Sequence, residues 1–599
     1  MSNTNATGFQ PTQVDTNADA ELPAKLTSTL SDEEAIDSTQ LIELDGNEGS
    51  IIFHPKTKDF DIGDVLYLRD RIQSSTSQNK SCEKEQENGL IVQIISKGIA
   101  NYPQADSKAL FRLLTSTYKR EYKRSYNEPK EVIDEFLIAE FIVRASIQDG
   151  QWKESEGKVV TRNVDIFLIK PSFLVENVVL PHLELSLNLG NYKKHPIRVY
   201  AGGFEKVNLI TGMKGGGKSH ITKGIIHLQR KLGMPSIVFD INGEYSSLPK
   251  VRLLVPGENL KFRIDQLPIA SLFRVFDKFS LFNTPATDNA VRANLPDVIK
   301  DCKGCNEMPD LDFLFKKSVD IVGSQDMMIG AYERGIKNLI SYNLFCTSKE
   351  ALKEDEILRT AKDNRTPQED LSVSSLKSIF YRMVHKIDDE TNPTCQNHEK
   401  LQSLEDLKAN AEVVVFDIAG LVPTVRKVVV SLIIDQLKEI CHKQSKAYQA
   451  ERVEIPIYPC VFFEEAQMYM DTDYIDELIP LIRHLGMNLF FITNTPGALP
   501  DSVFRLVDNL IMSRMINKKD IDKVVDCGLA DRKTIEGFAR DLKEYHSLFL
   551  SARKKATNNF PLVFNVRDFT ADQPDGEGLK ESGVTRSMWQ VINDHSKTT

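Results

Sequence analysis

Residues 208–220, Asn-Leu-Ile-Thr-Gly-Met-Lys-Gly-Gly-Gly-Lys-Ser-His, contain the groups of this chain best suited to hold a phosphate. The stretch fits the spacing G-x-x-x-x-G-K-[ST], whose glycines let successive backbone N–H groups face phosphate oxygens. Lys218 is placed to reach the β- and γ-phosphates of a nucleotide and so to take part in catalysis, and the Ser219 hydroxyl to hold Mg²⁺. The residues predicted to contact the nucleotide are Gly212, Met213, Lys214, Gly215, Gly216, Gly217, Lys218, Ser219 and His220.

The residues on both sides of this loop predict the elements that position it. Val207–Ile210 is an apolar run typical of a buried parallel strand, and Ile221–Leu232 has the pattern of a helix. The positive N-terminal end of such a helix faces a bound phosphate. A glycine-rich turn that fits the spacing by chance is the alternative, and the order strand, loop, helix favours the nucleotide site.

Two adjacent carboxylates follow another apolar run. Glu464 is expected to contact Mg²⁺ through a water, and Glu465 to orient or deprotonate the attacking water. The alternative is that the two acids simply open a helix, where the helix dipole favours them. Because a phosphate loop lies upstream, we interpret them as the acids of a hydrolytic site.

Three further polar residues lie near the ends of predicted elements. Asn494 follows an apolar strand, where its amide could sense the γ-phosphate. Arg483 could stabilise transition-state charge at a neighbouring subunit's nucleotide, although a lone arginine is more often a surface ion-pair partner. Asp240 either lies near the nucleotide and its Mg²⁺, or closes its strand and caps a turn, and the same alternatives hold for Glu244.

The apolar runs predict an α/β fold, a P-loop core with a central, mostly parallel sheet. Strands covered on both faces are continuously apolar, and most of these runs are. They are Val207–Ile210, Ser236–Asp240, Val413–Asp417, Pro459–Phe463, Asn488–Thr493 and Leu510–Arg514. Val425–His442 is predicted as an amphipathic helix between two of them.

The N-terminal part has a different texture. Short β-branched runs predict a small barrel or sandwich, with the last two runs forming a long hairpin. These runs are Ser50–His54, Val65–Leu68, Leu90–Ile95, Phe136–Ile147 and Val159–Ile169. The basic and aromatic stretch Tyr118–Tyr126 is either a nucleic-acid patch or, more commonly, a solvated helix face.

We therefore divide the chain as follows: residues 1–38 a disordered tail, 39–185 the β-barrel, 186–254 and 406–565 the ATPase core, 255–405 a helical insertion, and 566–599 a C-terminal arm. The tail assignment rests on its Ser, Thr, Asn and Asp content, which cannot bury enough apolar surface to order it.

Composition sets broad limits. The 599 residues carry a formal charge of −10, which gives no overall signature of nucleic-acid binding but allows a locally basic channel. The eight cysteines are scattered, as in a reduced protein. Neither a leader nor an apolar run of about 18 residues is evident, so a cytoplasmic protein is expected.

At this point the motifs, in their order, resemble the HerA branch of the HerA–FtsK superfamily of ring ATPases over most of residues 45–570. The segments that carry the resemblance are the phosphate loop, Asp240–Tyr245, Val414–Leu421, Glu464–Gln467, Arg483–Gly486 and Thr493–Pro496. This sequence departs from the family pattern at His484, where Lys is usual, at Gln467, where His is usual, and within the loop at Met213–Gly216.

The resemblance implies a RecA-like core and a homo-hexameric ring that translocates on double-stranded DNA with ATP and Mg²⁺. It also implies that Arg483 acts in trans, that Asn494 is the polar sensor, and that a separate nuclease or sirtuin-type effector works with the ring in DNA repair or anti-phage defence. No membrane partner is expected. An ATP-controlled scaffold and a secretion or conjugation ATPase are the alternatives. Candidates for contacts to the DNA backbone are Lys443 and Lys446, expected in a loop after the helix, Lys518 and Lys519, and Arg553–Lys555. The alternative for each of them, and the more common case, is a solvated surface.

Overall fold

The computed structural model describes residue 36 and residues 39–55, 58–70, 89–99, 136–148, 151–153, 164–178, 186–204, 206–249, 251–279, 281, 285–304, 309–322, 326–353, 411–449, 458–552 and 560–569. The chain divides into two compact units between Val178 and Val179, and each is described by itself. The tail 1–35, the stretch Tyr118–Tyr126, Arg553–Lys555 and residues 570–599 lie outside the described residues.

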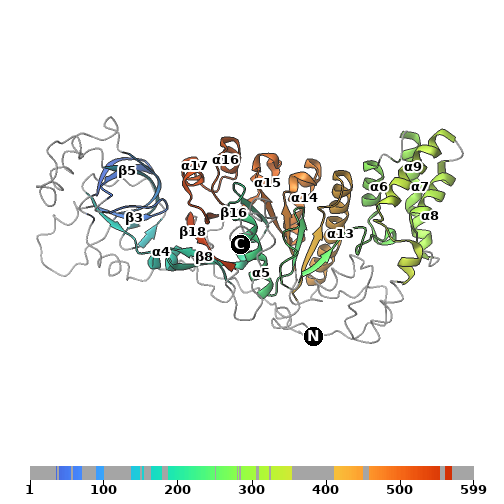
Figure 1. The fold of residues 1–599 in the computed structure, drawn as a ribbon, viewed down its shortest axis with the longest axis horizontal. Coiled ribbons are helices and arrows are strands. Elements are labelled where there is room, and N and C mark those ends of the chain that lie inside the picture. The colour runs from blue at the N-terminus through green and yellow to red at the C-terminus, as the bar shows by residue number, and fades with distance from the viewer. Residues whose placement is uncertain are drawn as a thin grey trace, which may run out of the picture. The chain divides into compact units, whose positions relative to one another are not determined.

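The N-terminal unit is an antiparallel sheet in the order β1-β2-β5-β4-β3-β7, with β6 paired to β5. Its strands are β1 (Thr39–Asp45), β2 (Glu48–Phe53), β3 (Val65–Asp70), β4 (Gly89–Ile99), β5 (Leu137–Gln148), β6 (Gln151–Lys153) and β7 (Val164–Leu168), followed by helix α4 (Pro171–Val178). The N–H of Ile36, just before β1, donates to the carbonyl of Ile166 on β7 at 2.9 Å. The two ends of the strand order therefore meet, and the sheet curls into the barrel seen in Figure 1.

Most strands expected here are present, but the predicted long hairpin is wrong. β5 pairs with the short β6, whereas β7 pairs with β3 at the far end of the order. Alternating side chains such as Ile51, Phe53 and Phe141 fill the interior of the curled sheet. Since β5 and β7 both supply inward apolar residues, their pattern alone did not reveal which strands pair.

The C-terminal unit is built on an eleven-stranded sheet in the order β12-β13-β11-β14-β15-β10-β16-β17-β18-β8-β9. The strands from β12 to β16 in this order are parallel, and those from β16 onward are antiparallel. The parallel strands are β10 (Val207–Thr211), β11 (Ser236–Asp240), β12 (Val251–Leu254), β13 (Val413–Asp417), β14 (Cys460–Glu464), β15 (Asn488–Thr493) and β16 (Val507–Met512). The antiparallel strands are β8 (Ser186–Tyr192), β9 (His195–Tyr200), β17 (His546–Ser551) and β18 (Leu562–Val566).

Every residue of β10, β11, β14 and β15 is buried, as expected for strands covered on both faces. The helices of the core are α5 (Lys218–Lys231), α13 (Pro423–Gln449), α14 (Thr472–Leu485), α15 (Asp501–Arg505), α16 (Lys518–Val525) and α17 (Arg532–Asp541). Short 3-10 turns are η3 (Ala201–Phe204), η4 (Ile264–Gln266), η5 (Ala466–Met468) and η6 (Pro496–Ala498). Figure 1 shows α13, α14 and α15 following one another along the sheet.

The described part of the segment between β12 and β13 is mainly helical. It contains α6 (Ile269–Lys278), α7 (Pro285–Gly304), α8 (Leu311–Val322) and α9 (Asp326–Ser341), which form one cluster in Figure 1. Buried apolar side chains such as Leu272, Leu295 and Leu339 line its interior.

Two candidate DNA contacts lie in a different element than the sequence predicted. α13 runs to Gln449, so Lys443 and Lys446 lie within this helix and not in a loop after it. Of the described helices, none combines the length and the apolar character needed to cross a bilayer.

Candidate nucleotide-binding and hydrolysis site

The strand order brings the predicted site residues to one edge of the sheet. β14 lies between β11 and β15, and β10 lies between β15 and β16. Because these strands are parallel, their carboxyl ends point to the same edge, where ligands bind in open α/β sheets. Along that edge the chain places Asp240, Glu464 with Glu465, Asn494 and then the phosphate loop after β10.

The phosphate loop has the backbone conformation that its glycines allow. Gly212 has φ 151°, and a Cβ there would lie 2.7 Å from Cβ of Ser513, so a larger residue would not fit. Gly217 has φ 82°, and nothing lies within 4 Å of the place that a Cβ would take, which leaves that side of the loop open. The N–H of Met213 donates to the carbonyl of Arg514 at 2.8 Å, which ties the loop to the end of β16.

Lys218 is held within this loop. Its Nζ donates to the carbonyl of Gly212 at 3.0 Å and to that of Met213 at 2.8 Å. Burial lowers the pKa of the Lys218 amine to about 8, while the nearby Glu465 and Glu244 carboxylates act in the opposite direction. The amine is therefore next to the loop N–H groups that would receive the phosphates, and a bound triphosphate would favour its charged form.

The two residues after Lys218 face different surroundings. Ser219 is half-buried in the first turn of α5. His220 Nε2 lies 2.9 Å from the carbonyl of Arg567, and the His220 ring packs 5.4 Å from that of Phe569. His220 is therefore engaged with the segment after β18, and its predicted nucleotide contact stays a prediction.

Glu465 lies at the centre of a polar network. Thr493 Oγ1 and Gln467 Nε2 donate to its Oε2 at 2.9 and 2.6 Å, and Asn494 Nδ2 donates to its Oε1 at 2.6 Å. Its backbone is left-handed, with φ 50° and ψ 52°, a conformation that is unfavourable for a residue with a side chain. The N–H of Glu465 donates to the carbonyl of Ile492 on β15 at 2.7 Å, which helps to hold this conformation.

Glu464 is buried, and its surroundings fit a divalent cation. Asn242 Nδ2 donates to its Oε1 at 3.0 Å, whereas its buried Oε2 has no hydrogen-bond partner among the described residues. Burial raises the pKa of Glu464 to about 8, and the nearby Asp240 carboxylate adds to the rise. A carboxylate with an unsatisfied oxygen in such a place is stabilised by Mg²⁺, which takes oxygen ligands and keeps several waters. Glu464 therefore fits a place beside the ion, whereas the contact predicted for Ser219 stays a prediction.

Asp240 adopts the turn-capping geometry, the second of its two predicted alternatives. Its Oδ1 accepts from the N–H groups of Asn242, Gly243 and Glu244 at 3.1, 2.7 and 3.1 Å. Its Oδ2 accepts from the Tyr245 N–H at 2.8 Å. These four bonds fix the turn that carries Asn242, so Asp240 acts on Glu464 through that turn and through its charge. They lend no support to a direct metal contact by Asp240.

Two contributors to the site were not predicted from the sequence. Both residues, Thr493 and Gln467, lie in segments that carry the family resemblance, but neither was assigned a role there, and both donate to Glu465. The available signal was the place of Thr493 at the end of an apolar run, directly before Asn494. Arg483 lies in the last turn of α14, but its side chain is outside the described residues.

A phosphate loop, the buried acid Glu464 next to the half-buried Glu465, and a polar strand end lie on one sheet edge. They define the class of P-loop nucleoside triphosphatases, and the groups present fit ATP with Mg²⁺. Residues 188–437 match the family described as "Helicase HerA, central domain". This part of the chain, which contains the phosphate loop, is therefore similar to the central domain of HerA.

Solved structures with a similar arrangement share little sequence with this chain. VirB4 of Thermoanaerobacter pseudethanolicus is 13% identical, with 65% of this chain and 98% of that chain covered and a TM-score of 0.42. The bacterial conjugative coupling protein TrwBdeltaN70 is 13% identical, with 69% and 95% covered and a TM-score of 0.40. The genome packaging NTPase B204 from Sulfolobus turreted icosahedral virus 2 is 12% identical, with 61% and 99% covered and a TM-score of 0.28. A search of the curated proteins gave no match.

Proposed function

We propose that this protein is an ATP-driven homo-oligomeric ring motor that translocates on double-stranded DNA. The hydrogen bonds to the Glu465 carboxylate are the observation that supports ATP hydrolysis. A carboxylate fixed beside the phosphate loop by Thr493, Asn494 and Gln467 is suited to orient a water for attack on the γ-phosphate. Ser219 and Glu464 would hold the Mg²⁺ that neutralises charge on the phosphates.

The ring is supported by apolar side chains at the nucleotide edge. Single exposed apolar residues need no explanation, but here several follow neighbouring strands at the same edge. They are Met213, Val422, Met468 and Ile516, which are 41, 47, 53 and 66% exposed. A second copy of this chain packed against that edge would bury them and would close the nucleotide site from the other side.

In such a ring Arg483 would reach the nucleotide of the adjacent subunit, because α14 starts beside the catalytic acids and its last turn carries this arginine. A guanidinium supplied in trans stabilises transition-state charge. The test is mixed rings. Arg483→Ala should abolish hydrolysis with little change in nucleotide affinity. In mixed rings, Lys218→Ala subunits should either be rescued by their neighbours or lower the hydrolysis rate of the whole ring. Mixtures whose rate is a simple sum of the components would argue against the trans role.

DNA as the substrate is supported by the match of residues 188–437 to a domain whose description names a helicase. An effector partner, a nuclease or a sirtuin-type protein, and a setting in repair or defence rest on the sequence resemblance alone. A pore that grips phosphates makes binding salt-dependent and largely independent of base sequence. The exposed Lys518 and Lys519, which follow β16 at the nucleotide edge, are candidates for such contacts.

The deciding experiment is ATP hydrolysis by the purified protein with and without long linear duplex DNA, across a salt series. Strong stimulation that fades as salt rises is the expected result for a motor. Hydrolysis that ignores DNA at every salt concentration would contradict the motor and favour a scaffold that ATP controls. Light scattering with and without nucleotide tests the ring, and a monomer at all concentrations would exclude it.

A further inference from the structure

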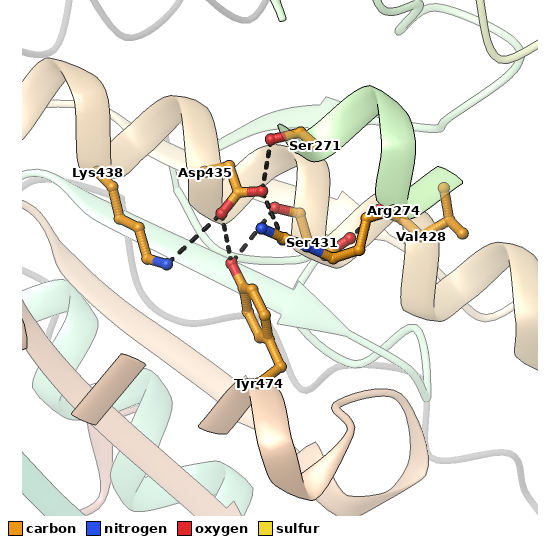
Figure 2. Close-up of polar contacts among 7 residues, drawn as sticks. All are labelled: Ser271, Arg274, Val428, Ser431, Asp435, Lys438 and Tyr474. Carbon is orange, nitrogen blue, oxygen red and sulfur yellow. Dashed lines mark hydrogen bonds and ion pairs between the residues drawn. The ribbon is translucent and has the colours of Figure 1, made fainter. Parts of the chain in front are cut away.

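A buried carboxylate joins three helices of the C-terminal unit. Asp435 on α13 is 7% exposed and accepts from Ser271 Oγ and Arg274 Nη1 of α6 at 2.7 and 2.6 Å. It also accepts from Tyr474 OH of α14 at 3.0 Å, and Lys438 Nζ lies 3.5 Å away (Figure 2). Because these donors come from different helices, the carboxylate links the helical segment to the core.

The ring of Tyr474 takes part in the same joint. The Arg274 guanidinium lies 5.1 Å and the Lys438 amine 4.9 Å from its centroid, so the ring contacts two cations. Burial raises the pKa of the Tyr474 hydroxyl well above its usual value, and the Asp435 charge adds to this. Tyr474 therefore stays a hydrogen-bond donor to Asp435.

A second carboxylate fixes the same end of α14. Asp471 lies just before the first residue of α14, and its side chain accepts from Lys278 of α6 at 2.5 Å and from Lys427 of α13 at 2.6 Å. Its backbone carbonyl accepts from the N–H of Ile475 in the first turn of α14 at 3.1 Å. The start of α14 is thus held to α6 at two points, through Arg274 and through Lys278.

The same end of α14 continues directly from the catalytic acids. Only the turn η5 and a few residues separate Glu465 from Asp471. The carbonyl of Glu465 accepts from Met468 N–H at 2.9 Å, and that of Ala466 from Met470 N–H at 2.8 Å, so this connection is a hydrogen-bonded turn. A shift at the start of α14 would be transmitted to Glu465, whose left-handed backbone depends on its surroundings.

We propose that Arg274 and Lys278 are positioning residues for ATP hydrolysis, which tie the helical segment between β12 and β13 to the start of α14. They touch neither nucleotide nor water in this role. They hold the turn that presents Glu465, and they give the helical segment a mechanical link to the hydrolytic acid. Anything that displaces α6, including a partner bound to the helical segment, would then change the rate of hydrolysis.

The test is the double variant Arg274→Met/Lys278→Met, which keeps most of the apolar stems and removes both cations. We expect kcat for ATP without DNA to fall about tenfold, since small misplacements of a catalytic group have effects of this order or more. KM for ATP should stay within about twofold, because the phosphate loop is untouched. The conservative variant Arg274→Lys/Lys278→Arg should restore most of the rate.

Asp277→Asn is the matched control. Asp277 lies on α6 between the two positioning residues, but its ion-pair partner is Arg292 of α7, away from α14. This variant should hydrolyse ATP at the wild-type rate. If the double variant does not fold, the single variants and Tyr474→Phe carry the test, because each removes one contact of the joint.

The proposal would be overturned if the double variant, or all of the single variants, had a lowered melting temperature but the wild-type kcat. The contacts among α6, α13 and α14 would then be structural only. An equal loss of rate in Asp277→Asn would also overturn it. The readout is hydrolysis without DNA, so it stands apart from the motor proposed above. A protein that hydrolyses ATP but does not move on DNA would refute the motor and leave this inference intact.

Discussion

Asn494 donates to Glu465 twice: its Nδ2 lies 2.6 Å and its backbone N–H 3.1 Å from Oε1 of that carboxylate. The residue expected to sense the γ-phosphate therefore holds the residue expected to orient the water. Through these two bonds Asn494 would keep the carboxylate in the orientation that the attacking water needs. The two predicted roles would then be linked by one observed contact.

Removing the charge of Glu465 should separate binding from turnover. We expect Glu465→Gln to bind ATP as the wild type does, because the phosphate loop is unchanged, and to hydrolyse it about 10²–10⁴-fold more slowly, the usual effect of losing a general base. Binding of a fluorescent nucleotide and release of phosphate measure the two quantities. Unchanged hydrolysis would show that another group activates the water.

The donors to Glu465 can be removed one at a time. Asn494→Ala should lower kcat by about tenfold or more, the order seen when one oriented polar group is lost, with KM nearly unchanged. Thr493→Val keeps the shape of the buried strand residue. It removes the bond to Oε2 and the bond that Thr493 Oγ1 accepts from Thr495 N–H at 3.0 Å, and a smaller loss is expected because Asn494 and Gln467 still hold Glu465. A rate above that of the wild type in either variant would mean that the donors restrain Glu465 and do not position it.

We predict that Asp240 stabilises the fold and does not bind the metal ion. In Asp240→Asn one oxygen is replaced by an amide that cannot accept, so a buried N–H of the turn loses its partner. We expect the free energy of unfolding to fall by about 2–3 kcal/mol, while the Mg²⁺ dependence of nucleotide binding is kept. Asp417→Asn is the matched control, since Asp417 ends the neighbouring strand but accepts one bond, from Ala419 N–H at 3.0 Å. A change in Mg²⁺ affinity in Asp240→Asn alone would restore a metal role for it.

The packing of the segment after β18 against α5 should require a glycine in that helix. A Cβ on Gly224 would lie 2.1 Å from the ring of Phe569, which is fully buried, so Gly224→Ala should destabilise the fold by about 1–3 kcal/mol. Phe569→Leu in the same chain should recover part of the loss by making room. Gly330→Ala in α9 is the control, because nothing lies within 4 Å of its added Cβ and alanine favours a helix. If Gly224→Ala and Gly330→Ala had the same melting temperature in thermal unfolding, the close packing of Gly224 against Phe569 would be disproved.

Local chemistry explains what was predictable. The phosphate loop could be identified because only glycines tolerate the backbone angles at Gly212 and Gly217, and the helix and strand beside it have strong patterns. β11, β13 and β15 begin and end where their continuous apolar runs predicted, since strands buried on both faces contain few polar residues. The antiparallel extension by β17, β18, β8 and β9 was not predicted, because short strands outside the parallel core have weaker patterns.

By itself, the sequence determined the loop that can bind a triphosphate, the acids that can work beside it and the order of the motifs along the chain. The tertiary structure decided which residues meet. Glu465 and Asn494 are 29 positions apart, and they touch because β14 and β15 are neighbours in the sheet, next to β10. Strand pairing is a contact between distant segments, set by the packing of the whole sheet. For that reason neither the partners of Glu465 nor the turn-capping role of Asp240 could be fixed from local residue patterns.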